Sequence, residues 1–336
     1  MRAFRVESPK PVRERPLAER DLPVPSPGPG EVRLRVLACG VCRTDVHVAE
    51  GDLQLRAGPV VPGHQVVGIV EARGPGVELP RAGDRVGVTW LASACGRCSA
   101  CLAGRENLCA EARFTGWDRD GGFAERMVAR ADFCLALPAT LSPLEAAPLL
   151  CAGVIGYRAL RLSGVARRER LGLVGFGASA HLALQAARAR GCEVLVFTRG
   201  ERHRKDALAL GAAWAGPLGE GPAGTPAECD AVVTFAPSGD VVPAALAHVR
   251  PGGTVAVNAV HLSDIPSFPY ERLFGERVLR SVSNLTRADA REFLELAASA
   301  PVRAHPVVYP FDRANDALRD VAESRLAGQA VLEIAS

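Results

Sequence analysis

Four cysteines crowd into one polar segment of this chain, at positions 95, 98, 101 and 109. Thiolates at such spacing let a single loop wrap one tetrahedral metal ion without help from the rest of the fold. A closed set of four thiolates favours zinc, and an iron–sulfur cluster is the alternative. We therefore expect Cys95, Cys98, Cys101 and Cys109 to hold a structural zinc ion in a lobe of about residues 93–112.

The chain has ten cysteines, and charged residues at Arg2 and Arg5 interrupt any apolar signal segment at its start. The longest nearly apolar run, residues 146–157, is shorter than the roughly 20 residues that cross a bilayer. A cytosolic compartment keeps thiols reduced, so metal binding is favoured over a disulfide framework. We expect a cytoplasmic protein that makes no membrane contact.

The charge balance argues against nucleic acid as a partner. Lysine and arginine total 40 against 37 acidic residues, for a net charge of +3. Nucleic-acid surfaces carry a clear excess of basic side chains. A small-molecule substrate is the expected partner.

Three further residues are candidates for a second metal site, which only the fold could assemble. Cys42 and His64 each lie beside turn glycines, and Cys151 follows an apolar stretch. Each also has an ordinary interpretation. Cys39 and Cys42 have the spacing of a redox pair. His64 can be a hydrogen-bonded loop residue, and Cys151 can be a thiol buried in the core. The residues alone leave both interpretations open.

The pattern of strands and helices changes near residue 145. Residues 32–139 contain short β-type runs broken by Gly and Pro, which indicate an irregular β domain. Strands then alternate with alanine-rich helical patterns, which are typical of βαβ units around a parallel sheet. We predict strands at 170–174, 193–197, 230–234 and 254–257, helices at 178–190, 288–298 and 313–323, and a last strand near Val331.

A glycine-rich turn joins the first predicted strand of this second region to its helix. Gly175, Gly177 and Ala180 match G-x-G-x-x-A. Small residues at these positions permit a tight turn and bring a pyrophosphate close to the backbone at a helix N-terminus. The strand before and the helix after the turn strengthen the match, so we predict a dinucleotide site.

The end of the next strand indicates which nicotinamide cofactor is bound. An acidic residue there binds the ribose 2′-hydroxyl of NAD, whereas an arginine accommodates the 2′-phosphate of NADP. This chain has Thr198 and Arg199 at that place and an acid only further on, at Glu201. We expect NADP, with NAD as the alternative.

These motifs together resemble the zinc-dependent alcohol dehydrogenases of the medium-chain dehydrogenase/reductase superfamily, over essentially the whole chain. The motifs around Cys42, His64, the four-cysteine lobe, Cys151 and the glycine-rich turn occur in the order of that family. Segments such as Trp90-Leu91 are most similar to bacterial alcohol dehydrogenases of the cinnamyl-alcohol-dehydrogenase-like group. The resemblance implies an α/β fold: a GroES-like β-rich catalytic domain (1–145), a Rossmann domain with a doubly wound parallel sheet (146–285), and a C-terminal segment (286–336) that completes the catalytic domain.

The resemblance also assigns roles at the second metal site. Cys42, His64 and Cys151 would bind a catalytic zinc ion, with a fourth position open for water or substrate. Asp45 would orient His64.

The same resemblance implies a proton path and a cofactor contact. Thr44 would take the substrate hydroxyl proton and relay it through the cofactor ribose to His47 at the solvent edge. Arg43 would contact the cofactor pyrophosphate.

Two residues raise specific questions. The family usually has Glu after the zinc histidine and this chain has Gln65, so we expect a slightly more electrophilic site and an altered exchange of ligands at zinc. Trp90 matches a pocket position that limits substrate size and favours unbranched primary alcohols, although it equally suits packing under the zinc lobe.

The predicted function is therefore hydride transfer between a primary alcohol, or its aldehyde, and NAD(P), in a homodimer or homotetramer. The alternatives are a zinc-free quinone or enoyl reductase, whose relatives lack the metal ligands, and a non-catalytic protein that binds zinc and nucleotide. The presence of Thr44 and His47 argues against the non-catalytic alternative, because a proton relay serves only turnover.

Overall fold

The structure is a computed structural model that describes residues 1–56, 58–222 and 228–335. It divides into two compact units. The first comprises Met1–Cys151, Asn284–Glu295 and Ala304–Ser336, and the second comprises Ala152–Ser283 and Leu296–Arg303. The second unit is thus inserted in the sequence of the first.

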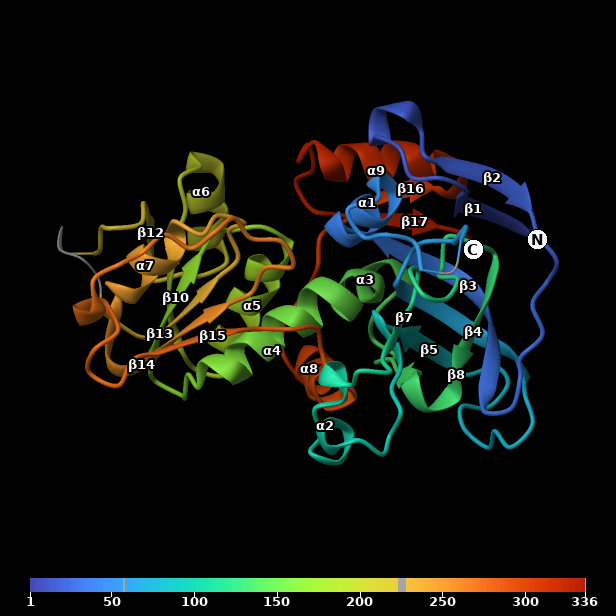
Figure 1. Ribbon diagram of the computed structural model, residues 1–336, viewed down its shortest axis with the longest axis horizontal. Coiled ribbons are helices and arrows are strands. Elements are labelled where there is room, and N and C mark those ends of the chain that lie inside the picture. Colours follow the sequence, from blue (N-terminus) through green and yellow to red (C-terminus); the bar gives the residue numbers. More distant parts are fainter. Residues whose placement is uncertain (57, 223–227, 336) are drawn as a thin grey trace. The chain divides into compact units, whose positions relative to one another are not determined.

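Strands dominate the first unit (Figure 1). They are β1 (Arg2–Val6), β2 (Leu17–Asp21), β3 (Glu31–Val41), β4 (Gln65–Arg73), β5 (Arg85–Val88), β6 (Leu91–Ser93), β7 (Arg113–Phe114), β8 (Arg126–Arg130), β9 (Leu135–Ala136), β16 (Pro306–Pro310) and β17 (Gln329–Glu333). The helices are α1 (Arg43–Glu50), α2 (Ser99–Leu102), α3 (Pro143–Pro148) and α9 (Ala314–Ala322), with 3-10 turns η1 (Val12–Glu14), η2 (Glu106–Leu108), η3 (Ala131–Phe133) and η6 (Phe311–Arg313).

The main sheet of this unit has the strand order β16-β17-β3-β4-β5-β9, and β8 also pairs with β3. Strand β3 alternates buried and half-buried residues along most of its length, as a strand does when one face covers a core. The C-terminal strand β17 pairs antiparallel with β3, so that Leu332 lies opposite Cys39. The end of the chain therefore completes the sheet that begins near residue 31.

A continuous helical run leads from the first unit into the second. Helix α3 ends at Pro148, the π-helical turn η4 (Leu149–Gly153) follows, and α4 (Val154–Ser163) continues. Proline has no N–H to donate and disturbs regular α-helical bonding, and single π-turns are frequent at functional sites. Cys151 lies within this π-turn.

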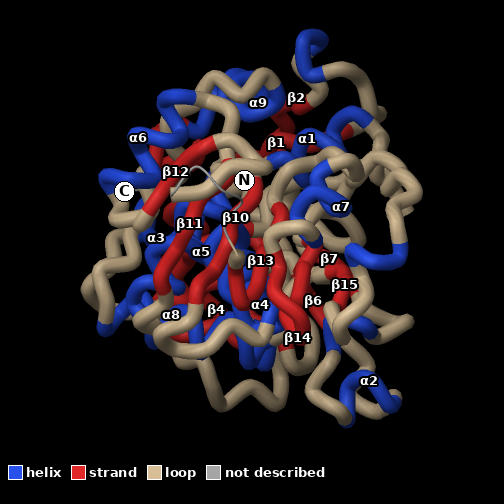
Figure 2. The backbone as a smooth tube through the Cα atoms, turned by 90° about the vertical axis from the view of Figure 1, so that its left-hand side faces the viewer, coloured by secondary structure: helices blue, strands red, loops and turns tan. Residues whose placement is uncertain are grey.

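The second unit is an α/β unit around a parallel sheet. Its elements are β10 (Arg170–Val174), α5 (Ala178–Ala189), β11 (Glu193–Phe197), α6 (Glu201–Ala209), β12 (Trp214–Gly216), β13 (Cys229–Thr234), α7 (Val241–Leu246), β14 (Val249–Val257), η5 (Tyr270–Arg272) and β15 (Val278–Ser281), while α8 (Arg287–Ser299) has residues in both units. The strand order is β12-β11-β10-β13-β14-β15, and Figure 2 shows most of these strands side by side.

The predicted strands of this region are confirmed, although β14 begins at Val249, five residues before the predicted strand at 254–257. Strands β10 and β11 have the predicted bounds, and α5 ends one residue earlier than expected. The order places β10 between β11 and β13, where the direction of chain progress reverses. Ligands of doubly wound sheets bind outside the carboxyl ends of the strands at such a point. The glycine-rich turn follows directly from β10.

Candidate metal centres and cofactor site

Helix α1 carries several of the predicted site residues in a few turns. Cys42 is its N-cap, with the Thr44 N–H donating to Cys42 Sγ at 3.4 Å and the Cys42 N–H donating to Asp45 Oδ2 at 2.9 Å. This reciprocal capping fixes the start of the helix. Thr44 and His47 are three residues apart, so they lie on one face of the helix.

Cys42, His64 and Cys151 come together as the resemblance implied. Their ligand atoms all lie within 4.8 Å of one another, and His64 Nε2 is 3.4 Å from Cys42 Sγ. The His64 ring is buried and donates from Nδ1 to Asp45 Oδ1 at 3.2 Å, while the Gly63 N–H donates to the same oxygen at 3.1 Å. Asp45 therefore leaves Nε2 of His64 directed at the thiols.

The electrostatics of this cluster suit a cation. The hydrogen bond to Cys151 and burial raise the pKa of Cys42 well above its usual range. Burial is the largest influence on His64 and lowers its pKa, but Asp45 and Cys42 outweigh it and bring the pKa to about 10. Two sulfurs and one imidazole nitrogen form a donor set that zinc prefers, so the residues present fit a zinc ion.

The four cysteines at 95, 98, 101 and 109 also converge, with Sγ atoms within 4.8 Å of one another. Backbone N–H groups point at the sulfurs: Cys98 donates to Cys95 Sγ, and Cys95 donates to Cys109 Sγ, both at 3.4 Å. The N–H groups of Arg97 and Cys98 lower the pKa of Cys95. Four thiols held by one segment, with N–H groups directed at the sulfurs, fit a closed zinc site.

This cysteine lobe is attached to the rest of its unit through Glu106 and Arg287. Glu106 is buried and accepts from the backbone N–H of Arg287 at 3.0 Å and from its Nε at 3.2 Å. The Arg287 guanidinium also lies 4.3 Å from the ring centroid of Phe133. Helix α8 is thereby fixed to the lobe.

Gln65 lies beside the His64 cluster at the start of β4 and is 3% exposed. Gly40 is opposite it in the sheet, and a Cβ at Gly40 would come within 2.8 Å of the Gln65 side chain. Gln65 Nε2 has no hydrogen-bond partner among the residues that the structure describes. The absence of a side chain at position 40 thus makes room for Gln65.

Trp90 packs against the ring of His64 with its centroid at 4.9 Å and the planes at 75°. It also stacks on Phe114 and Trp117, at centroid distances of 5.3 and 5.9 Å. Trp90 is half-buried, so it combines contact with a candidate zinc ligand and packing near the lobe. The geometry is compatible with both sequence interpretations of Trp90.

The glycine-rich turn has the conformation that a dinucleotide turn needs. Gly175 has a φ of +87°, and a Cβ there would come within 3.1 Å of the Ala236 nitrogen. Gly177 is the N-cap of α5 and has open space where a Cβ would project. Ala180 is buried in the first turn of the helix. The turn therefore fits a pyrophosphate at the start of α5.

The end of β11 presents Thr198 and Arg199, as the sequence indicated. Thr198 is buried and Arg199 is exposed. Arg204 was not among the predicted residues, yet its Nε and Nη2 donate to the carbonyl groups of Thr198 and Arg199 at 3.0 and 2.9 Å. A basic side chain seven residues beyond the end of β11 gives no sequence signal of this role, because the turn between the strand and α6 decides where the side chain points.

Arg43 and His47 make contacts that the sequence did not indicate. Arg43 donates to the Ala322 carbonyl at 2.7 Å and to Ser324 Oγ at 2.9 Å, at the end of α9. His47 Nδ1 lies 2.8 Å from Asp52 Oδ2. Asp52 is five residues from His47, outside the usual helical pairings, so periodicity did not reveal it.

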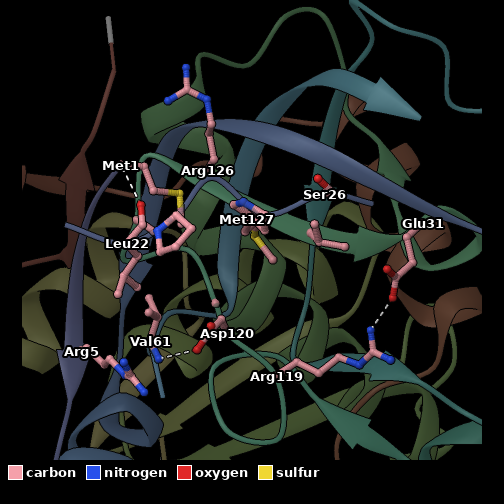
Figure 3. A pocket seen from close by; sticks show the side chains of 15 residues that line it. Met1, Arg5, Leu22, Ser26, Glu31, Val61, Arg119, Asp120, Arg126 and Met127 are labelled. Carbon is pink, nitrogen blue, oxygen red and sulfur yellow. Dashed lines mark hydrogen bonds and ion pairs between the residues drawn. The ribbon is translucent and has the colours of Figure 1, made fainter. Parts of the chain in front are cut away.

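A cavity of about 500 Å³ opens elsewhere in the first unit (Figure 3). Arg119 and Asp120 line it, but Arg119 pairs with Glu31 at 2.6 Å and Asp120 accepts the Val61 N–H at 2.8 Å. No predicted site residue lines it. These two charges are therefore used within the protein, and we do not assign the cavity to the reaction. Across the described ranges, no helix is both long and apolar enough to traverse a membrane.

Comparison with known proteins places these features in a family. Residues 28–139 match the model for an alcohol dehydrogenase GroES-like domain, and residues 180–299 match that for a zinc-binding dehydrogenase. The chain is 48% identical over 341 residues to a "Probable alcohol dehydrogenase" of Mycobacterium tuberculosis, covering 99% of this chain and 97% of the relative. It is 36% identical to an alcohol dehydrogenase of Geobacillus stearothermophilus, covering 96% and 97%.

Solved structures show the same similarity. A cinnamyl alcohol dehydrogenase from Sorghum bicolor superimposes with a TM-score of 0.88 at 28% identity, covering 99% of this chain and 97% of that one. A structure described as an NAD-dependent alcohol dehydrogenase gives a TM-score of 0.88 at 26% identity over the full length of both chains. Named relatives thus include a cinnamyl alcohol dehydrogenase and an NAD-dependent enzyme.

Proposed function

The chain belongs to the zinc-dependent alcohol dehydrogenase family, and from this premise we propose that it interconverts primary alcohols and their aldehydes with NADP(H) as preferred cofactor. It is an oxidoreductase with zinc-dependent alcohol dehydrogenase activity. The observation that carries the proposal is the convergence of Cys42, His64 and Cys151 beside Thr44, on a chain whose other unit carries a dinucleotide turn. The zinc-free reductase alternative is disfavoured, because its relatives lack these three ligands.

We propose that Cys42, His64 and Cys151 hold the catalytic zinc, and that the four cysteines of the lobe hold the structural one. When bound, the catalytic zinc supplies Lewis acidity that polarises the substrate oxygen. Asp45 keeps Nδ1 of His64 occupied, so that Nε2 is available as a ligand. Gln65, which has no charge, lies beside the site where the family usually has a carboxylate.

The protein's own residues move the proton. Thr44 accepts the hydroxyl proton of the alcohol, and His47, one turn further along α1, passes it to water. His47 is 21% exposed, which suits exchange with solvent. A bound nicotinamide would supply the acceptor for the hydride of the substrate carbon.

Several residues are proposed to bind the cofactor. Gly175, Gly177 and Ala180 form the turn and first helical residues at the pyrophosphate, and Arg43 adds a positive charge if it exchanges its contacts at the end of α9. Thr198 and Arg199 read the 2′-phosphate. The preference for NADP rests on the arginine at this position and the lack of an acid there.

The substrate proposal rests on Trp90. Its large ring packs edge-on against the His64 ring and occupies space near the candidate zinc ligands. Such a ring disfavours branched carbons beside the reacting carbon, so unbranched primary alcohols and their aldehydes are the proposed substrates.

We propose a homodimer or homotetramer in the cytoplasm. Strand β15 is the last strand of the sheet order in the second unit, and its residues are mostly exposed. Exposed apolar side chains lie in the neighbouring segment, including Val260, Tyr270 and Phe274. A sheet edge of this kind, with apolar side chains beside it, favours association with another copy of the chain. The cytoplasm is proposed because a reducing compartment keeps the ligand thiols reduced.

The test of the proposed function is kcat/KM for NADPH and for NADH with a panel of aliphatic and aromatic aldehydes, on zinc-loaded protein. We expect NADPH to be preferred and the preference to collapse in Arg199→Ala. The matched control is Arg202→Ala, which removes a neighbouring charge that pairs with Asp206 at 3.8 Å. A preference for NADH in the unmodified protein would overturn the NADP proposal, and zinc and nucleotide binding without aldehyde reduction would favour the non-catalytic alternative.

A further inference from the structure

The end of helix α1 returns the chain toward His47. The His47 carbonyl accepts hydrogen bonds from the N–H groups of both Gly51 and Leu53, each at 3.1 Å. Gly51 has a φ of +89°, a conformation that other residues adopt at a cost. This left-handed turn brings Asp52, which lies between the two donors, back over the last turn of the helix.

The result is a close contact between two side chains. His47 Nδ1 lies 2.8 Å from Asp52 Oδ2. An ionised carboxylate only accepts hydrogen bonds, so the ring must donate from Nδ1. The His47 side chain is 21% exposed and that of Asp52 is 62% exposed, which leaves the pair open to water.

We propose that Asp52 is a positioning residue of the proton relay: it holds the His47 ring in the tautomer that carries its proton on Nδ1, so that Nε2 exchanges the proton. This inference rests on the proposed function, in which His47 passes the substrate proton to water. A proton that arrives binds the lone pair of Nε2 and gives an imidazolium ion, whose charge faces the Asp52 carboxylate. The same proton then leaves Nε2 for water, and the neutral ring keeps its Nδ1 proton.

The contact is chemically suited to this role because the choice of tautomer decides which nitrogen is available. Without an acceptor at Nδ1, a neutral imidazole distributes its proton between both nitrogens. Asp52 makes no other ion pair among the residues that the structure describes. Its carboxylate is therefore not shared with a second cation in the described structure.

The test compares four variants of the full-length, zinc-loaded protein in alcohol oxidation with NADP⁺. They are Asp52→Ala, Asp52→Asn, His47→Gln and the control Glu50→Gln. Asparagine keeps an acceptor oxygen for Nδ1 without the charge. Glu50 is an exposed acid at the end of the same helix, and its side chain accepts the Val12 N–H at 3.0 Å, which glutamine also does.

We expect Asp52→Ala to lower kcat about tenfold, a fraction of the 10²–10⁴-fold that acid–base groups contribute, with KM changed by less than about twofold. Asp52→Asn should recover most of the loss, and added imidazole should raise kcat of the alanine variant more than that of the unmodified protein. A role confined to holding the loop would not produce rescue by a diffusible base. Glu50→Gln should keep the original kcat.

The proposal is overturned if Asp52→Ala retains its kcat, if neither asparagine nor imidazole restores it, or if Glu50→Gln is equally slow. A thermal unfolding curve for each variant shows whether a loss of kcat reflects loss of fold. If His47→Gln retains full kcat, the relay in the proposed function is wrong. If His47→Gln is slow and Asp52→Ala is not, only the inference about Asp52 fails.

Discussion

Replacing Asp45 by asparagine should weaken one metal site and leave the other intact. The buried carboxylate accepts three hydrogen bonds, from the Cys42 N–H at 2.9 Å, the Gly63 N–H at 3.1 Å and His64 Nδ1 at 3.2 Å. An amide keeps one acceptor oxygen and turns an NH₂ group toward a donor that it cannot satisfy. Wherever the amide points, His64 or the N-cap of α1 loses its partner.

His64 either loses its acceptor or keeps a neutral amide oxygen in place of a carboxylate, and both changes make it a weaker zinc ligand. Loss of the group that orients a metal-binding histidine typically costs 10–100-fold in affinity, which is about 1.4–2.7 kcal/mol. An unsatisfied buried donor adds about 1–3 kcal/mol of lost stability. Asp45→Asn should therefore release the zinc held by Cys42, His64 and Cys151 at a 10–100-fold lower chelator concentration, while the zinc of the four-cysteine lobe stays bound.

The assay is zinc per chain, measured by atomic emission across a chelator titration. The matched control is Asp289→Asn, because Asp289 is also buried and accepts from the Thr286 N–H at 2.9 Å and from Thr286 Oγ1 at 2.6 Å, and it makes none of the hydrogen bonds given above for His64 and Cys42. It should lower stability without changing zinc release. The reasoning is refuted if Asp45→Asn releases both ions together, or if its release curve matches that of the control.

Four further predictions follow from the contacts around the two metal sites. Glu106→Gln should cost about 2 kcal/mol of stability at pH 7, because a charged hydrogen bond to Arg287 is lost. The contacts to Arg287 hold the pKa of Glu106 below its usual 4.5 despite burial, so the stabilisation by the Glu106 carboxylate is present above about pH 4.5 and disappears as pH falls. Unfolding curves at several pH values check this. Cys101→Ser should remove about one zinc ion per chain and destabilise the lobe, as read by zinc content and thermal unfolding. Gln65→Glu should lower kcat for aldehyde reduction and change zinc retention, since it places a carboxylate beside the metal; unchanged turnover and retention would contradict the idea of a more electrophilic site. Trp90→Ala should widen the substrate range toward branched aldehydes, and an unchanged range would leave Trp90 a packing residue.

The predicted α/β fold and the main elements of the second unit were accessible from the sequence because their signals are local. A strand at 170–174, a glycine-rich turn and a helix from residue 178 follow one another directly. The spacing of apolar residues and the small residues of the turn therefore identify them. The pairing of β17 with β3 depends on contacts across nearly the whole chain. The sequence pattern alone contains no signal for such a pairing, and only the resemblance implied it.

The candidate site divides in the same way. The four-cysteine lobe was predicted from spacing, since its ligands share one segment. Cys42, His64 and Cys151 were individually ambiguous, and the resemblance rather than the spacing grouped them. Asp52 and Arg204 were missed, because a left-handed glycine in one case and a strand-to-helix turn in the other decide where the side chains lie.

The two candidate metal sites differ in when their ligands become available during synthesis. The lobe has all its thiols as soon as residue 109 leaves the ribosome, and a short segment suffices to enclose the ion. The other site lacks a ligand until Cys151 has been made, and strand β3, which leads to Cys42, pairs with β17 only after residues 329–333 have been made. The lobe can therefore take up an ion on a shorter nascent chain than the cluster of Cys42, His64 and Cys151 can.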